Sequence, residues 1–465
     1  MEFKLKDYNL KDTICAIATF PSKSALGVIK ISGKKSLDIV SKIFLPKKKK
    51  DIKKAKTYTF HYGWIVDRRD KKEVFVDEVL VSIMRAPFSY TKEDVVEISS
   101  HGGILVLNKI LELVLKNKAR LALPGEFTYR ALVNGRINLL EAESILAIVE
   151  AKTQGVLDFA VRQLKGEADK KFEGLKSQIK EIFIQTESLI NFPEEEIEIS
   201  LKNIEEKLKE IEKQINVFLK TVKFSDILKE GLRCVICGKA NAGKSTLFNR
   251  LLKQERVIVS KIPGTTRDVI EETIDIRGVP LKIYDTAGIF EPEDLITKKA
   301  IEKTKKTFEE ADLVIFVLDG SRPLNKDDFF LWEKVKSKNA ILVINKIDLK
   351  QRLKLNKFEE KIPKVYLSAL KNIGIEELEK RIFKMVYERG LDRENLLFLS
   401  NFQKEILKRV KEKIIQAENF LKEGYSIDFV NFSLKECLDE LRKLMGEVIC
   451  EEILESIFSN FCIGK

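Results

Sequence analysis

Residues 232–252, LRCVICGKANAGKSTLFNRLL, decide the fold of the middle of this chain. The apolar run LRCVIC is typical of a buried strand, GKANAGKS has the spacing GxxxxGKS, and LFNRLL has the composition of a helix. This order predicts a P-loop, in which backbone N–H groups and the positive end of a helix surround a phosphate. We expect Lys244 to place its charge between the β- and γ-phosphates, and Ser245 to offer a hydroxyl to Mg²⁺.

Two later segments carry residue types that would complete a phosphate and magnesium site. In VIVSKIPGTTRD (257–268), Thr266 would complete the Mg²⁺ shell and sense the γ-phosphate. The strand in PLKIYDTAG (280–288) would deliver Asp285 towards the metal through a water molecule, with Gly288 beside the γ-phosphate.

The base of the nucleotide would be read by AILVINKID (340–348), a buried strand with a polar end. The carboxylate of Asp348 can accept the N1–H and the 2-amino proton of guanine, two donors that adenine lacks. In VYLSAL (365–370), Ser368 and Ala369 would contact the guanine oxygen through their backbone. Four motifs in this order predict a GTPase. The expected GTP contacts are Asn241, Ala242, Gly243, Lys244, Ser245, Thr246, Ser260, Lys261, Ile262, Pro263, Gly264, Thr265, Thr266, Asp285, Thr286, Ala287, Gly288, Asn345, Lys346, Asp348, Ser368 and Ala369.

The residues that would catalyse hydrolysis are less evident, beyond Lys244 and Thr266. Many small GTPases place a glutamine directly after DTAG to orient the attacking water, but here that position is Ile289. Arg267 and Arg250 are candidate arginine fingers, and nothing in the sequence favours either. Another group must therefore supply charge and position the water.

The flanks of this α/β unit predict a helical domain into which it is inserted. Apolar residues recur every three or four positions from Leu201 to Val222, which indicates one buried helix seam, and we favour packing in an intramolecular bundle over a free coiled coil. Helical periodicity also covers 138–190 and is broken at NFPEEEIEI (191–199), where Pro193 would end a helix. It resumes from about 400 to the end.

The N-terminal segment reads as an α+β domain. TICAIAT and ALGVIKISG are expected strands, TYTFHYGWIV and VFVDEVLVSIM an expected hairpin, and VVEISSHGG a strand before a helix. His101 at that strand end would be functional or would cap the helix. The predicted segments are an α+β domain (1–126), a first helical half (127–226), an inserted α/β P-loop domain (227–385) and a second helical half (386–465).

Composition and charge bear on the partners and the location of the protein. The net charge of +12 over 465 residues suits a polyanion such as RNA, or reflects Lys and Glu interleaved on exposed helix faces. Cys234 and Cys237 form a CxxC inside an apparent strand, which favours packing over metal or redox chemistry. No run of about 20 apolar residues and no secretory signal is evident, so we expect a cytoplasmic protein without a membrane partner.

The motifs together closely resemble the MnmE (TrmE) family of tRNA-modification GTPases. SHGG, LPGEFTYRALVNGRINLLEAE (123–143), NAGKST, PGTTRD, DTAGI and the terminal FCIGK carry this resemblance, which spans essentially the whole chain. It implies a homodimer with an N-terminal folate-binding domain, a helical domain and an inserted G domain. It also implies a heterotetramer with the flavoprotein MnmG, which brings FAD and uses NADH. Together they would add an aminomethyl or carboxymethylaminomethyl group to carbon 5 of the wobble uridine of certain tRNAs.

The resemblance also implies a folate site for 5,10-methylenetetrahydrofolate or 5-formyltetrahydrofolate. Its residues would be Lys30, where relatives carry Arg, together with Glu97, Arg136 and the last residue, Lys465. The C-terminal tail would then fold back into this site. Cys462 would act in the one-carbon chemistry or would be a packed thiol that anchors the tail.

The family's K⁺ ion near the phosphates would supply the charge of an arginine finger. Its ligands here would be Asn241, Ser260, Ile262 and Thr265. The sequence departs from the family at Thr297, where relatives carry a glutamate that helps to place the attacking water; Glu291, Glu293 or Asp294 would have to substitute, or hydrolysis would be slow. The alternative function is a ribosome-assembly or signalling switch GTPase without modification chemistry of its own, which would need neither the PGEFTYR block nor the CIGK tail.

Overall fold

The computed structural model divides the chain into two compact units, which are described separately. The first unit comprises residues 1–146, 163–213 and 399–465, and the second comprises 147–162 and 214–398. The residues that the structure describes are 9–48, 51–69, 72–191, 200–254, 271–285, 308–355, 362–387, 397–448, 454, 458, 461 and 464.

The first unit contains a seven-stranded sheet in the order β3-β4-β5-β6-β2-β1-β7. All neighbouring strands are antiparallel except β1 and β7, and β4 and β5 form the predicted hairpin. The strands are β1 (Ile14–Ile17), β2 (Ser24–Ser32), β3 (Phe44–Pro46), β4 (Thr59–Arg69), β5 (Lys72–Met84), β6 (Val95–Gly102) and β7 (Arg120–Leu121).

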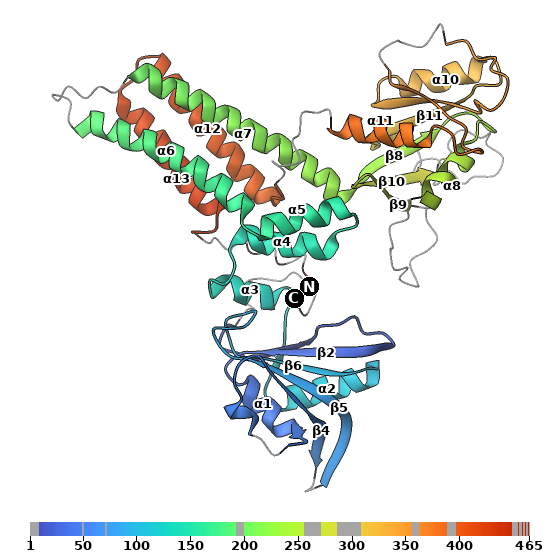
Figure 1. Ribbon diagram of the computed structural model, residues 1–465. Helices are drawn as coiled ribbons and strands as arrows, with labels where there is room; N and C mark the ends of the chain where they lie inside the picture. Colours follow the sequence, from blue (N-terminus) through green and yellow to red (C-terminus); the bar gives the residue numbers. More distant parts are fainter. Residues whose placement is uncertain are drawn as a thin grey trace. The chain divides into compact units, whose positions relative to one another are not determined.

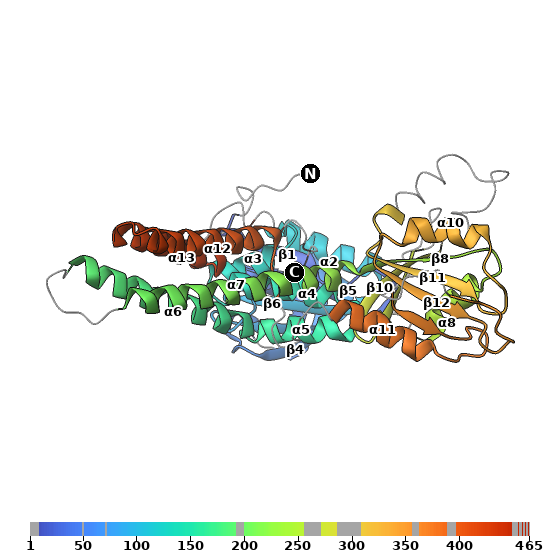
Figure 2. The same cartoon turned by 90° about the horizontal axis from the view of Figure 1, so that it is seen from above.

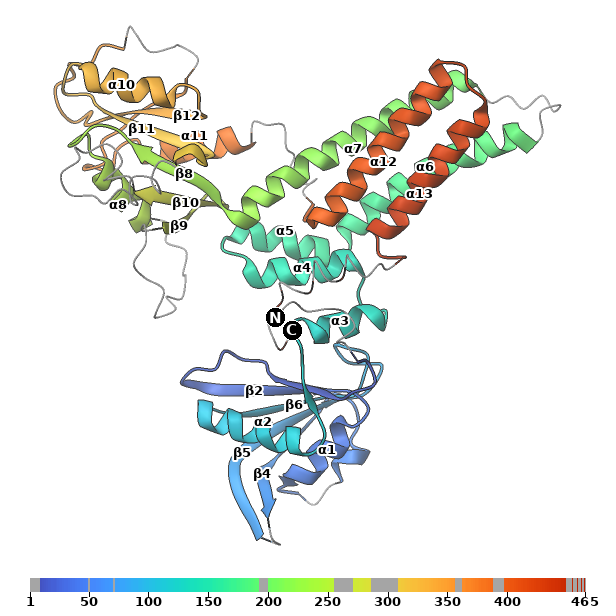
Figure 3. The same ribbon diagram turned by 180° about the vertical axis from the view of Figure 1, so that it is seen from behind.

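The two faces of this sheet differ, because side chains alternate along each strand. One face carries residues such as Ile29, Val81 and Ile98 and packs against the helices α1 (Ser36–Ile43) and α2 (Ile104–Lys116) (Figure 3). The other face presents Lys30 opposite Glu97. This face is largely uncovered, because several apolar side chains on it are exposed, among them Leu26, Phe60, Tyr62 and Leu80.

The helical part of the first unit is a bundle of α6 (Glu167–Asn191), the first half of α7 (Leu201–Glu230), α12 (Asn401–Lys422) and α13 (Ile427–Leu444) (Figure 1). The shorter helices α3 (Glu126–Val133) and α4 (Leu139–Glu150) precede it. The predicted seam on α7 is confirmed from Ile204 to Val222, which are buried, but Leu201 is exposed because it is the first residue of the helix. Pro193 lies outside the described residues.

The two charged residues of the segment PGEFTYR, Glu126 and Arg130, belong to a buried network of ion pairs. Arg130 and Glu126 are both fully buried and pair at 3.0 Å, one helical turn apart on α3. Arg130 also donates to Glu93 at 3.0 Å and to the backbone oxygens of Asp12 and Asn9, and Glu126 accepts from Arg120 at 2.8 Å. The network therefore ties α3 to the N-terminal segment and to the loop before β6.

The second unit is a six-stranded sheet in the order β13-β12-β11-β8-β10-β9, parallel except for β9. Helices α5 (Gln154–Leu164), α8 (Lys244–Gln254) and α11 (Ile375–Tyr387) contribute to one core, and α10 (Lys326–Val335) to the other (Figure 2). The strands are β8 (Leu232–Cys237), β9 (Glu271–Ile276), β10 (Val279–Asp285), β11 (Leu313–Asp319), β12 (Ala340–Asn345) and β13 (Lys364–Tyr366). The predicted class, an α+β domain and a helical domain with an inserted P-loop domain, is confirmed.

The CxxC of β8 is structural. Cys234 packs in the core with α8, whereas Cys237 packs in the core with α10, so the two thiols face opposite sides of the sheet. Burial raises the pKa of the Cys237 thiol to about 12. The predicted preference for packing over metal or redox chemistry agrees with this placement.

Residues 147–162, from the segment predicted as the first helical half, belong to the second unit. Thr153, just before α5, donates its hydroxyl to the backbone oxygen of Gly278 at 2.9 Å, in the turn between β9 and β10. Gly155 lies so close that a Cβ there would come within 2.7 Å of the same oxygen. This turn therefore depends on a glycine for its close approach. Over the described part of the chain, none of the helices has the length and apolarity needed to cross a bilayer.

Candidate functional site

The carboxyl ends of the parallel strands in the second unit bring together the predicted nucleotide residues. The P-loop follows β8 and leads into α8, which begins at Lys244, as predicted. Asn241 and Gly243 have φ values of 62° and 97°, a left-handed backbone that turns the loop sharply. The Lys244 ammonium donates to the backbone oxygen of Lys239 at 2.9 Å across the loop. The loop and the helix N-terminus thus have the form that binds a phosphate.

One buried amide connects three of the predicted motifs. The Nδ2 of Asn345, at the end of β12, donates to the backbone oxygen of Ala242 in the P-loop at 2.9 Å. Its Oδ1 accepts from the backbone N–H of Ala369 at 3.0 Å and of Lys346 at 2.8 Å. Asn345 therefore links the P-loop to the segment around Ser368. Ser368 is also buried.

The lysine of the NKID motif also bonds to the P-loop. Lys346 Nζ donates to the backbone oxygen of Asn241 at 2.8 Å and pairs with Asp319 at 2.6 Å. Lys346 itself has a left-handed backbone, with a φ of 66°. Asp348, the predicted guanine acceptor, is exposed two residues further on.

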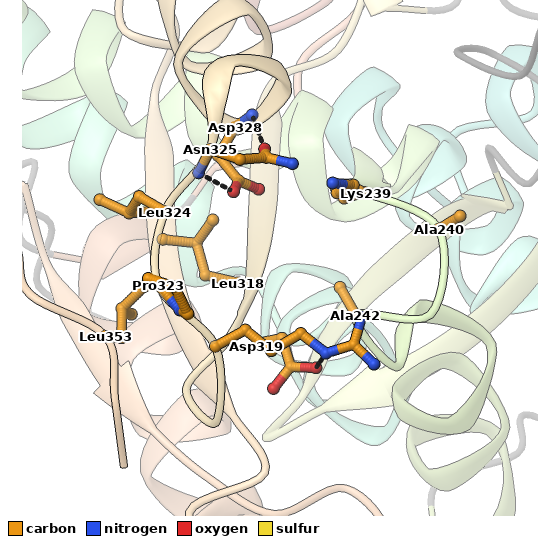
Figure 4. Close-up of a pocket in the computed structure, with 11 residues that line it drawn as sticks. Lys239, Ala240, Ala242, Leu318, Asp319, Pro323, Leu324, Asn325, Asp328 and Leu353 are labelled. Atoms are coloured by element: carbon orange, nitrogen blue, oxygen red, sulfur yellow. Dashed lines mark hydrogen bonds and ion pairs between the residues drawn. The ribbon is translucent and has the colours of Figure 1, made fainter.

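A cavity of about 300 Å³ lies beside the first half of the P-loop (Figure 4). Lys239 and Ala242 line it on one side, and Leu318, Asp319 and Leu324 line it on another. Among the predicted GTP contacts that the structure describes, Ala242 alone lines this cavity.

Arg250, one of the two candidate arginine fingers, bonds to the segment after β13. Its guanidinium donates to the backbone oxygens of Ala369 at 3.2 Å and Leu370 at 3.0 Å. It therefore supports the loop that would contact the guanine oxygen. These contacts do not favour its reading as an arginine finger, which stays a prediction.

The predicted metal ligands whose side chains the structure describes, Ser245 and Asn241, offer a hydroxyl and an amide oxygen. Ser245 and Thr246 are exposed in the first turn of α8, and the Asn241 side chain is exposed in the P-loop. Within the described ranges, no three Asp, Glu, His or Cys side chains group to hold a metal ion. Oxygen atoms of this kind suit Mg²⁺ that is also bound by phosphates, and an amide oxygen suits K⁺.

A second cluster of predicted site residues lies on the uncovered face of the N-terminal sheet. Lys30 Nζ is 3.7 Å from a Glu97 carboxylate oxygen, 5.0 Å from the centre of the Tyr90 ring and 5.4 Å from that of Phe127. The Arg136 guanidinium lies 4.6 Å from the centre of the Tyr90 ring. Two cations, a carboxylate and an aromatic ring fit a ligand with a flat heterocycle and an anionic tail.

Tyr90 is the part of this cluster that the sequence analysis missed. Its hydroxyl lies 2.9 Å from that of Thr128, and burial raises its pKa. The segment between β5 and β6 gave no periodic signal that would have singled it out.

The C-terminal tail packs within the first unit, where it is described. Phe458 and Phe461 are buried, 5.3 Å apart between ring centres, and Phe458 lies edge-on to Tyr129 of α3. Gly464, with a φ of 98°, is buried against the end of β1, where a Cβ would lie 3.0 Å from the backbone oxygen of Ile17. At these three positions the tail is therefore packed against the first unit rather than exposed to solvent.

His101 does not cap the following helix. Its Nδ1 lies 2.7 Å from an Asp77 oxygen, and the N-cap of α2 is Gly103, without a side-chain cap bond. The capping interpretation is wrong because the pleat of β6 turns the ring towards β5.

Several predicted site residues lie outside the described residues or have undescribed side chains. The side chain of Asp285 is among them, although its backbone ends β10 beside β8. The others are Ser260, Lys261, Ile262, Pro263, Gly264, Thr265, Thr266, Arg267, Thr286, Ala287, Gly288, Ile289, Glu291, Glu293, Asp294, Thr297, Cys462 and Lys465.

The fold and the P-loop site define the chain as a multidomain P-loop GTPase. A family profile described as "GTP-binding protein TrmE N-terminus" matches residues 13–136, and one described as "MnmE helical domain" matches residues 139–462. The tRNA modification GTPase MnmE of Thermoanaerobacter pseudethanolicus is 44% identical over 98% of this chain and 99% of its own. The protein of the same name from Bacillus subtilis is 38% identical over 98% and 100%. The chain therefore belongs to the MnmE family.

A solved structure of Era from Aquifex aeolicus, bound to GDP and AlF4⁻, is also similar to the chain. It is 30% identical and covers 39% of this chain and 65% of its own, with a TM-score of 0.26.

Proposed function

We propose that the protein hydrolyses GTP and that this activity serves the modification of carbon 5 of the wobble uridine in certain tRNAs. The observation that carries the proposal is the bonding of Asn345 to both the P-loop and the segment at Ala369, in a chain of the MnmE family. Such an arrangement supports binding of phosphate and guanine by one preorganised site.

In the G domain, binding and orientation fall to residues of the P-loop and the strand ends. Lys244 and the N-terminus of α8 would neutralise phosphate charge, and Asp348 would accept from guanine. Mg²⁺ would be held by Ser245 and Thr266, with Asp285 acting through water. K⁺ would be held by Asn241, Ser260, Ile262 and Thr265 and would add positive charge where an arginine finger is missing.

The N-terminal domain would bind the folate that provides the one-carbon unit. Lys30, Arg136 and Lys465 would be its basic contacts, with Lys30 beside Glu97, and Glu97 would accept from the N–H groups of its pterin ring. The proximity of Lys30, Glu97 and Arg136 around Tyr90 supports this assignment. Cys462 would take part in the chemistry or anchor the tail; full tRNA modification by Cys462→Ser would exclude the chemical role.

The proposed assembly is a homodimer joined with MnmG, which would supply FAD and use NADH. The exposed apolar side chains on the open face of the N-terminal sheet, including Phe60 and Tyr62, support contact between two copies of the domain. The net charge of +12 suits a tRNA substrate, and we infer that the protein works in the cytoplasm.

Nucleoside mass spectrometry of tRNA tests this function. A strain that lacks the protein should lose the wobble modification and accumulate uridine without the C5 substituent, and the wild-type gene should restore it. Lys244→Ala and Glu97→Ala should each fail to restore it, for lack of GTP and folate binding respectively. Unchanged tRNA in the deletion strain would contradict the proposal and would favour a GTPase switch without modification chemistry.

A further inference from the structure

Asp319, which none of the GTPase motifs includes, ends the strand β11 next to the strand that ends in Asn345. Its carboxylate is mostly buried, with its side chain 13% exposed. One oxygen accepts from the backbone N–H of Ser321 at 2.9 Å and from its hydroxyl at 2.6 Å. The other oxygen pairs with Lys346 Nζ at 2.6 Å. Ser321 thus orients the carboxylate through one oxygen, and the other oxygen faces Lys346.

These bonds keep Asp319 charged. Burial raises the pKa of its carboxyl, but the hydrogen bonds from Lys346 and Ser321 outweigh burial and leave the pKa below its usual value. Arg322 approaches the same oxygen only to 3.8 Å and is mostly exposed, so it contributes little.

The Lys346 ammonium is committed to the protein by two bonds. It lies between the Asp319 carboxylate and the backbone oxygen of Asn241 in the P-loop. Two of the three donors of the ammonium are used in these bonds. The two bonds fix the tip of the side chain and hold its apolar stem in one conformation. The charge of Lys346 is therefore engaged within the protein.

We propose that Asp319 is a positioning residue for guanine nucleotide binding, acting through Lys346. It anchors the ammonium so that the stem forms a fixed apolar wall beside the base and the P-loop stays tied at Asn241. The proposal rests on the proposed function only in that the site binds GTP and GDP.

Loss of the negative charge should free the ammonium without removing the side chain. Asp319→Asn keeps the volume and an oxygen for Ser321 but no longer attracts Lys346 as an ion. A hydrogen bond to a charged group is worth about 1.5–3 kcal/mol, so GDP and GTP affinities should fall about tenfold or more. Faster dissociation should account for most of this loss, because the remaining contacts still admit the nucleotide.

Affinity and dissociation rate of a fluorescent GDP analogue, measured on the full chain at fixed KCl and MgCl₂, test the proposal. Asp319→Asn is compared with Asp319→Glu, Lys346→Met and the double variant. Asp327→Asn is the matched control, because Asp327 pairs with Lys239 at 3.2 Å on the surface of the same region. Thermal unfolding of each variant shows that it is folded.

The variants are expected to differ in their affinity for GDP. Asp319→Asn weakens GDP binding about tenfold, Asp319→Glu restores most of it, and Asp327→Asn stays within about twofold of the wild type. In the Lys346→Met background, Asp319→Asn adds less than about a twofold loss, because its partner is already gone.

Three results would overturn the role of Asp319: binding by Asp319→Asn equal to that of the control, equal losses for the Asn and Glu variants, or additive losses in the double variant. Failure of the wild-type protein to bind GDP or GTP would instead overturn the proposed function.

Discussion

Replacing Arg130 with methionine, which keeps most of the side-chain volume and removes the charge, should destabilise the first unit by about 3–5 kcal/mol. Arg130 is fully buried and holds Glu126 and Glu93, each at 3.0 Å. Breaking a buried pair leaves a carboxylate without its full complement of partners, and desolvation then opposes folding. The bonds from Arg130 to the backbone oxygens of Asp12 and Asn9 would be lost as well.

Thermal unfolding followed by circular dichroism measures this effect. For a unit of this size, about 1 kcal/mol corresponds to roughly 2–4 °C, so the transition of the first unit should fall by roughly 10 °C. Lys116→Met is the matched control: it removes an exposed i,i+4 pair with Glu112 and should cost no more than about 1 kcal/mol. Adding Glu126→Gln to Arg130→Met should recover part of the loss. A transition for Arg130→Met equal to that of Lys116→Met would refute the reasoning.

Three further predictions concern the second unit and the bundle. Asn345→Ala should lower GDP affinity at least about tenfold in calorimetric titration, because it leaves the backbone oxygen of Ala242 and two N–H groups without their partner; unchanged affinity would count against the network. Gly155→Ala should destabilise the second unit by about 1–3 kcal/mol in urea unfolding, since its Cβ would clash with the backbone oxygen of Gly278. Gly174→Ala, in the exposed interior of α6 with no atom near, should instead stabilise by up to about 1 kcal/mol; the same sign for both glycine variants would contradict this reasoning.

Local signals predicted the arrangement of elements well. The strand at 232–237 alternates between two cores, and the P-loop and α8 follow it as the motif requires. The seam from Ile204 to Val222 was readable because helical spacing is a local property. Leu201 departed from it because the end of a helix is set by its surroundings rather than by periodicity.

The long-range partners could not be read from the sequence. Asn345 was predicted to bind GTP, but its bonds to a residue 103 positions earlier are visible only in the fold. Arg130 belonged to a recognisable block, yet its bond to Asn9 spans 121 positions. Asp319 did have a signal, because it ends a buried strand as Asp285 and Asn345 do, and carboxyl ends of parallel strands meet at one edge.

Steady-state hydrolysis by the purified full chain, with GTP or ATP and in KCl or matched NaCl, tests the central claim most directly. The account predicts turnover of GTP but not ATP, because Asp348 would read guanine, and a clear increase in KCl, because Asn241 would help to hold K⁺ beside the phosphates. Equal rates in both salts would contradict the cation site. Equal rates with both nucleotides would contradict the guanine site.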